Sequence, residues 1–190
     1  GAIGSEFAYF YNALGTEVIL VELLSNIVPL EDEEVSKQLG RSFKKTKITV
    51  KTDSTLDSYE KTDDGCKAII KTKKGEETVI ADVILSAVGI KTNIENIGLE
   101  DTGIETDKGK VVVDEFYKTS VEGYFAIGDI VHGQELAHVA SHEAIVCVEK
   151  IAGLDPKPID YGNIPACTYT SPEIASVGLN EAKATEKGHD

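Results

Sequence analysis

The chain has 190 residues, of which 41% are hydrophobic and 27% charged, a composition typical of a globular protein with one domain or two small ones. Its net charge of -14 and its single arginine, Arg41, argue against nucleic acid and anionic lipid as partners, because clustered Lys and Arg bind both. The apolar runs 18–21 and 83–88 fall far below the roughly 18 residues that a membrane span needs, so we expect no membrane segment.

The first elements are expected to be a glycine turn, a helix and a strand. Apolar residues recur at helical spacing from Ser5 to Leu14, and Gly15 is well placed to end that helix. The run 18–21 is short, continuous and rich in β-branched residues, which is typical of a parallel strand covered on both faces. This strand ends at Glu22.

A second helix is expected over about 31–44, because acids fill its first turn, bases fill its last turn, and one face is apolar, at Val35, Leu39 and Phe43. Short alternating stretches broken by glycine turns then predict a strand and an antiparallel meander, over 48–51, 55–60, 67–72 and 77–80. The run 83–88 has the pattern of another buried strand.

The second half begins with a segment rich in Asn, Gly, Asp and Thr, over 91–110, which indicates a domain boundary near residue 90. Beyond it we expect strands over 111–113 and 124–127, a helix over 136–152, and a linker over 155–158. A strand-rich segment begins at Pro165. The order of elements predicts an α/β fold.

Three cysteines, Cys66, Cys147 and Cys167, stand far apart, and no C-x-x-C pair or group of nearby histidines suggests a metal site. We therefore predict reduced, structural thiols in a cytosol-like compartment. The chain starts inside a motif and has no methionine, so we interpret it as an internal fragment in which any targeting signal would be invisible.

The first candidate site is the turn Gly1-Ala2-Ile3-Gly4, whose backbone N–H groups and following helix could face a diphosphate. A glycine pair at a helix start is often only a tight turn. Glu22, however, ends the next predicted strand, where a carboxylate can accept both ribose hydroxyls of an adenosine. It would repel a 2′-phosphate, and no arginine follows it, so NAD is favoured over NADP.

The second candidate site is the sequence A-I-G-D that ends at Asp129, followed by L-A-H at the head of a predicted helix. Gly128 would let the backbone approach a ligand, Asp129 could accept a sugar-alcohol hydroxyl, and the helix start near Ala137 could stabilise negative charge on a ring carbonyl. The alternative is that Asp129 caps a helix and His138 is an ordinary surface residue.

Taken in order, these motifs resemble the flavoprotein pyridine nucleotide-disulfide reductases over essentially the whole chain. The resemblance rests on G-A-I-G-S-E with Glu22, on A-I-G-D and L-A-H, and on P-A-C-T-Y-T-S-P-E-I-A-S-V-G, which is similar to the start of the family's dimerisation domain. It implies a Rossmann-like NAD-binding domain with an antiparallel β-meander over 1–90, part of the FAD-binding central domain over 91–160, and the start of an α+β dimerisation domain over 161–190.

Carried over by position, the resemblance implies two sets of cofactor-binding residues. For NAD they are Gly1, Ala2, Ile3 and Gly4 at the diphosphate, Glu6 near the nicotinamide, Glu22 at the ribose, and Leu56 and Gly89 at the adenine. For FAD they are Asp129 at the ribityl chain and Glu135, Leu136, Ala137 and His138 along the flavin ring. The family's redox cysteine pair and catalytic histidine match no residue here, so we expect no catalytic residue in this chain.

Four positions depart from the family pattern. Ile90 and Thr92 stand where an arginine and a proline are usual, Glu122 replaces a common proline, and Glu135 replaces a common methionine. Glu135 could therefore alter the edge of the flavin site.

The resemblance favours the members that oxidise dihydrolipoyl groups with NAD+ in 2-oxo-acid dehydrogenase or glycine-cleavage complexes. It implies a homodimer, lipoyl-bearing proteins as partners, and a bacterial cytoplasm or a mitochondrial matrix. The alternatives are another flavoprotein disulfide reductase, an NADH oxidase-like enzyme, or a non-catalytic NAD-binding module. We expect the 190 residues alone to be poorly stable, to retain little FAD and to oxidise no dihydrolipoamide, because the strand before Gly1 is lacking.

Overall fold

The computed structural model of the chain describes residues 1–189 and divides into two compact units. The first unit contains Gly1–Val88 together with the segment that begins at Pro165, and the second unit is Gly89–Ile164. Asp190, the last residue of the expected third domain, lies outside the described residues. Helices and strands occur in both units, which confirms the expected α/β class.

The first unit opens with helix α1 (Ala2–Ala13), which begins three residues before the expected start and ends just before Gly15. Gly15 has a φ of +94°, a backbone conformation that favours glycine. Strand β1 (Ile19–Val21) follows and pairs in parallel with β2 (Thr49–Lys51), as its apolar run predicts. Only part of β1 is covered, because Ile19 stays exposed.

Helix α2 (Glu33–Lys45) connects β1 to β2 and confirms the predicted amphipathic helix. Its apolar face supplies the two largest fully buried side chains of the unit, Leu39 and Phe43, which are 0% and 1% exposed. They belong to one core cluster, with Ala8, Ile27, Val28, Ile48 and Ile174. Acidic residues in its first turn and lysines in its last turn complement the helix dipole.

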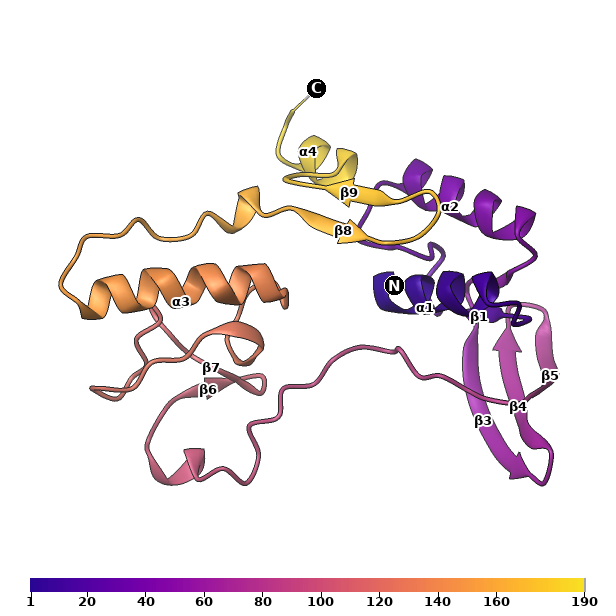
Figure 1. Ribbon diagram of the computed structural model, residues 1–190, viewed down its shortest axis with the longest axis horizontal. Helices are drawn as coiled ribbons and strands as arrows, with labels where there is room; N and C mark the ends of the chain where they lie inside the picture. The colour runs from indigo at the N-terminus through magenta and orange to yellow at the C-terminus, as the bar shows by residue number, and fades with distance from the viewer. Residues whose placement is uncertain (190) are drawn as a thin grey trace. The chain divides into compact units, whose positions relative to one another are not determined.

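The meander is confirmed as three antiparallel strands in the order β3-β4-β5, seen side by side in Figure 1. They are β3 (Thr55–Thr62), β4 (Gly65–Thr72) and β5 (Gly75–Ala81). Gly65 starts β4 with a φ of +137°, and a Cβ there would lie 2.5 Å from the Ala81 carbonyl oxygen. Only glycine fits that turn.

The strand expected over 83–88 is wrong. These residues join no ladder with any described strand, and Val88 is 95% exposed. A strand forms only where a neighbouring strand accepts and donates its backbone hydrogen bonds, and neither β1 nor β2 pairs with this run. The apolar run alone does not supply that partner.

The C-terminal segment of the first unit contains an antiparallel pair, β8 (Ala166–Thr168) and β9 (Ile174–Ser176), and the short helix α4 (Glu181–Glu186). The strand-rich segment expected from Pro165 is therefore confirmed. Figure 1 shows this segment, in yellow, beside α1 and α2. Backbone N–H groups of Tyr169 and Glu181 donate to side chains of the N-terminal region, and Ile174 enters its core.

The second unit has little regular structure before helix α3 (Ala137–Ile151), which confirms the helix expected over 136–152. Its other elements are short, namely η1 (Leu99–Asp101), β6 (Thr106–Asp107), β7 (Lys110–Val111), η2 (Gly128–Ile130) and η3 (Tyr161–Asn163). Of the strand expected over 111–113, only Val111 lies in a strand, β7. The strand expected over 124–127 is wrong, because Phe125 makes a single bridge, to Lys118.

None of the helices that the structure describes is long and apolar enough to cross a membrane.

Candidate nucleotide-binding sites

The glycine turn forms the accessible N-terminal end of α1. Gly1 is the N-cap, Ala2 and Ile3 are exposed, and a Cβ built on Gly1 would meet no atom within 4 Å. A Cβ on Gly4 would instead touch its neighbours, at 3.6 Å from Ala87 Cβ and 3.7 Å from Leu20 Cδ1. A Cβ would thus fill the space between α1 and these side chains and leave none for a larger group, whereas the turn at Gly1 stays open to an anion at the positive end of the helix.

Glu22 follows β1 directly and lies against the glycine turn. Its Oε2 accepts a hydrogen bond from the Gly1 amine at 2.8 Å, and its Oε1 accepts one from the Leu24 N–H at 2.9 Å. Burial of the carboxylate raises its pKa, but the Leu24 N–H and the Gly1 amine together outweigh burial, and the pKa falls below its usual value. The structure thus brings the two parts of the first candidate site together, with an ionised carboxylate held in place.

Leu56 and Glu6 also belong to the first unit. The Ser54 N–H donates to the Glu22 carbonyl oxygen at 3.0 Å, so β3 begins beside Glu22 and carries Leu56, which is 39% exposed. Glu6 lies on α1, where its Oε1 accepts a hydrogen bond from the Tyr169 N–H at 2.8 Å. Gly89 is the first residue of the second unit, with a φ of +126°.

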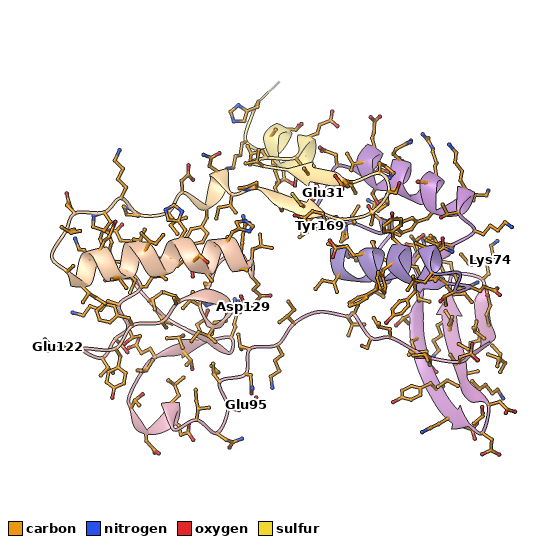
Figure 2. All side chains as sticks on the ribbon, viewed as in Figure 1. Glu31, Lys74, Glu95, Glu122, Asp129 and Tyr169 are labelled. Atoms are coloured by element: carbon orange, nitrogen blue, oxygen red, sulfur yellow. The ribbon has the colours of Figure 1, made fainter. Side chains whose placement is uncertain are left out.

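The second candidate site is built on η2, beside the first turns of α3. Gly128 has a φ of +73°, and a Cβ there would lie 3.4 Å from Ala140 Cβ, so glycine lets the turn approach the helix. Asp129 is exposed, and Figure 2 shows its side chain beside the N-terminal end of α3. The alternative that Asp129 caps a helix is wrong, because Leu136 is the N-cap of α3 and no side chain caps η2.

Residues 135–138 lead from the loop after η2 into α3. Leu136 is half-buried, while Ala137 and His138 are exposed at the start of the helix. The half-buried Glu135 forms an ion pair with Lys110, whose Nζ lies 2.6 Å from Glu135 Oε1. Lys110 also donates to the carbonyl oxygens of Asp129, at 3.2 Å, and Val131, at 3.1 Å. The charge that distinguishes Glu135 from the family pattern therefore has a local counter-ion, which the sequence alone did not reveal.

Sequence reasoning also missed Glu143, a carboxylate on the buried face of α3 that is only 1% exposed. Its Oε2 accepts from the Gly128 N–H at 2.6 Å, and its Oε1 accepts from the Tyr161 hydroxyl at 2.6 Å. The Tyr117 hydroxyl lies 3.1 Å from that of Tyr161. A signal was present in the sequence, because Glu143 interrupts the apolar stripe that Val139 and Val146 continue on the same helix face.

Burial strongly raises the pKa of Tyr161, and its hydrogen bond to the Glu143 carboxylate raises that pKa further. Burial also raises the pKa of Tyr117. Both phenols are therefore protonated at neutral pH. With the Tyr161 proton directed at Glu143, the Tyr117 hydroxyl donates to the Tyr161 oxygen.

Two hollows of about 400 Å³ lie within the second unit, one lined by Lys91, Ile94, Leu99 and Gly109 among others, and one by Val112, Tyr117, His132 and Pro158 among others. Neither is lined by Asp129 or by residues 135–138. Asp129 and the start of α3 form an open surface, which suits one wall of a larger site. Within residues 1–189, no cluster of three or more His, Cys, Asp or Glu side chains could hold a metal, and the three cysteines are free.

Comparisons with known proteins identify the family of the chain over a range that includes both candidate sites. The sequence profile of the family described as pyridine nucleotide-disulphide oxidoreductase matches residues 1–144, and the profile of that family's dimerisation domain matches residues 164–190. Proteins named dihydrolipoyl dehydrogenase are 46% identical in Rhizobium etli and 44% identical in Zymomonas mobilis, each over 100% of this chain. A mitochondrial protein of that name from Arabidopsis thaliana is 39% identical over 99% of the chain. The chain spans about 40% of the length of these relatives.

Solved structures agree with the sequence matches. LpdA from Mycobacterium tuberculosis superimposes with a TM-score of 0.89 and 28% identity, over 98% of this chain and 40% of that one. The HOCl-induced flavoprotein disulfide reductase RclA from Escherichia coli has a TM-score of 0.88 at 22% identity, over 100% of this chain and 43% of that one, and shows the same fold. Members of the matched family use FAD and NAD. With a glycine turn held against Glu22 and an exposed Asp129 beside α3, this chain belongs to the pyridine nucleotide-disulphide oxidoreductases.

Proposed function

We propose that the protein carrying this chain is an FAD-containing dihydrolipoyl dehydrogenase, which oxidises dihydrolipoyl groups and reduces NAD+. The observation that carries the proposal is the 46% identity to a protein of that name over the whole chain. The geometry supports it, since Glu22 lies 2.8 Å from the glycine turn and Asp129 is presented beside α3.

For NAD we propose that Gly1, Ala2, Ile3 and Gly4 bind the diphosphate and that Glu22 accepts the adenosine ribose hydroxyls. The open surface at Gly1 and the fixed Glu22 carboxylate fit these roles. Leu56 and Gly89 would border the adenine. Glu6 would lie near the nicotinamide, where its bond to the Tyr169 N–H restricts it.

For FAD we propose that Asp129 binds the ribityl hydroxyls and that Glu135, Leu136, Ala137 and His138 border the flavin ring. The left-handed Gly128 presents Asp129, and the start of α3 places backbone N–H groups and the positive helix end at the ring edge. When bound, FAD would accept the two electrons of the dithiol and NAD+ would accept them as hydride.

We also propose an NAD-binding domain over 1–90, an FAD-binding segment over 91–160, and an interface domain from 161 onward. The dimerisation-domain match over 164–190 favours a homodimer. Lipoyl-bearing proteins of 2-oxo-acid dehydrogenase complexes would be the partners. The bacterial and mitochondrial relatives favour a bacterial cytoplasm or a mitochondrial matrix.

Turnover with defined electron donors tests this proposal. The purified protein that carries these 190 residues should reduce NAD+ with dihydrolipoamide and show the absorbance of a bound flavin. A protein that oxidises other dithiols, or passes electrons only from NADH to oxygen, while leaving dihydrolipoamide untouched, would contradict it.

Glu22→Ala tests the ribose assignment. Loss of a charged hydrogen-bond acceptor should weaken NADH binding about tenfold or more, and should reduce the preference for NAD over NADP. Fluorescence titration of NADH measures the affinity. Glu17→Ala, which removes an exposed acid just before β1, is the matched control and should leave the affinity unchanged. Equal NADH affinity in the Glu22 variant and the native protein would contradict the assignment.

A further inference from the structure

A buried acid connects α3 to the turn that presents Asp129. Glu143 lies two helical turns into α3, and its Oε2 accepts the Gly128 N–H at 2.6 Å, one residue before Asp129. Gly128 has a left-handed φ of +73°, and a Cβ built there would lie 3.4 Å from Ala140 Cβ, so glycine suits both the turn and its close approach to α3. The position of the Asp129 backbone therefore depends directly on the Glu143 carboxylate.

Tyr161 ties the same carboxylate to the loop that leads into α3. Its hydroxyl donates to Glu143 Oε1 at 2.6 Å, and its carbonyl oxygen accepts from Gln134 Nε2 at 3.3 Å. A Cβ built on Gly133 would lie 3.0 Å from Tyr161 Cε1, so the ring packs directly against that backbone. Tyr161 thus contacts the segment that ends at Glu135, while Glu143 holds the segment that begins at Gly128.

Glu143 accepts its hydrogen bonds from two neutral donors, the Gly128 N–H and the Tyr161 hydroxyl, and no lysine or arginine among residues 1–189 forms an ion pair with it. Burying a carboxylate under these conditions costs more free energy than burying an apolar side chain of the same size. The carboxylate is the group that two donors from separate segments can share.

We propose that Glu143 and Tyr161 are positioning residues for the flavin, which hold the Gly128–Asp129 turn and the 133–136 loop in register with the start of α3. This inference rests on the proposed function, because it assigns the surface formed by the Gly128–Asp129 turn and the 133–136 loop to FAD. Tyr117 lies at the outer end of the hydrogen-bond chain and contacts neither Gly128 nor Glu143 through a hydrogen bond. It therefore provides a buried-hydroxyl control.

The test compares FAD release from the holoprotein of four variants, followed by the rise in flavin fluorescence. Glu143→Ala should accelerate release about tenfold or more, and Tyr161→Phe should accelerate it by a smaller factor. Glu143→Gln should release FAD slowly, because the amide oxygen still accepts from Gly128. Tyr117→Phe should match the native protein. The flavin absorbance band should shift in Glu143→Ala and stay unchanged in Glu143→Gln.

Two results would overturn the inference when the native protein binds FAD. One is native-like release from both Glu143→Ala and Tyr161→Phe. The other is that a control variant releases FAD as fast as the variant it controls for, either Glu143→Gln as fast as Glu143→Ala or Tyr117→Phe as fast as Tyr161→Phe. Faster release would then follow from any change of a buried polar side chain.

Amide hydrogen exchange separates this inference from the proposed function. In the flavin-free protein, the Gly128 N–H should exchange slowly and should lose protection in Glu143→Ala but keep it in Glu143→Gln. Equal exchange of the Gly128 N–H in the native protein and in Glu143→Ala would overturn the positioning role of Glu143 whether or not FAD binds. Absence of FAD binding by the native protein would instead contradict the proposed function. The exchange result would then decide by itself whether Glu143 holds the Gly128–Asp129 turn.

Discussion

Each candidate site contains a charged side chain with a defined partner, Glu22 in the first site and Lys110 in the second. The sequence predicted Glu22, because an acid at the end of the strand that follows the glycine turn and its helix has a recognisable place in a nucleotide-binding fold. It did not predict Lys110, because the partner of Glu135 stands 25 residues earlier and no periodicity relates the two. The role of a charged residue is thus predictable when a motif fixes its place at the end of a strand. It is unpredictable when the residue meets its partner only after the chain has folded.

The lowered pKa of Glu22 predicts a pH-dependent contribution to stability. Its folded pKa lies below the usual 4.5, so the carboxylate stabilises the fold fully above that value, and this stabilisation is lost as pH falls through the lower folded pKa. Urea unfolding of the 190-residue chain and of its Glu22→Gln variant should therefore differ most near neutral pH and converge in acid. A stability difference that stays constant from about pH 6 to pH 3 would contradict this.

Lys110→Met should destabilise the second unit. The methionine preserves much of the side-chain length but leaves Glu135 without its cation and the Asp129 and Val131 carbonyls without a donor. We expect a loss of about 1 to 3 kcal/mol in the free energy of unfolding, measured by urea titration. Lys118→Met, at an exposed lysine of the same unit, is the control. Equal losses in both variants would show that the ion pair does not contribute to the stability of the second unit.

At the scale of elements, the helices α2 and α3 and the meander were predictable, whereas two of the predicted strands have no continuous neighbour. α2 and α3 form where their apolar periodicity indicates, since a helix satisfies its hydrogen bonds within its own segment. The meander also forms, because each strand meets the next through a tight turn. The runs 83–88 and 124–127 have the composition of strands but no continuous neighbour among the described residues.

Leu39→Ala tests the predicted buried face of α2. Leu39 is 0% exposed in the core of the first unit, so truncation should leave a cavity and reduce the free energy of unfolding by about 2 to 5 kcal/mol. Leu30→Ala makes the same chemical change at a side chain that is 81% exposed, and should cost little. Urea unfolding measures both. Similar losses at the two positions would mean that α2 is not packed as described.

At the scale of the whole molecule, the first unit joins segments that lie far apart in the sequence. Ile174 is 7% exposed and shares a core with Leu39 and Phe43, and the Ser42 hydroxyl donates to the Ser171 carbonyl oxygen at 2.7 Å. The strand-rich segment after Pro165 was expected. Its packing on α1 and α2 was not, because no local pattern encodes a contact across more than one hundred residues.

Ile174→Ala should therefore weaken α2 and leave α3 unaffected. Loss of three methyl or methylene groups from the shared core should speed amide exchange at Leu39 and Phe43, while exchange at Val146, in the second unit, should stay the same. Ile80→Ala, at a side chain that is 69% exposed, is the control. Faster exchange at Val146 as well, or no change in α2, would contradict this division into units.

The sequence by itself determined the helices, the meander, the family resemblance and the positions of Glu22 and Asp129, because each depends on spacing within one segment or on a motif of a few residues. The tertiary structure alone decided that the run 83–88 pairs with no described strand, that Lys110 neutralises Glu135, and that Glu143 and Tyr161 hold the turn before Asp129. These contacts join segments whose separation is set by loop conformation and core packing. Contacts of that kind produce no periodic pattern in the sequence, so they cannot be predicted from it.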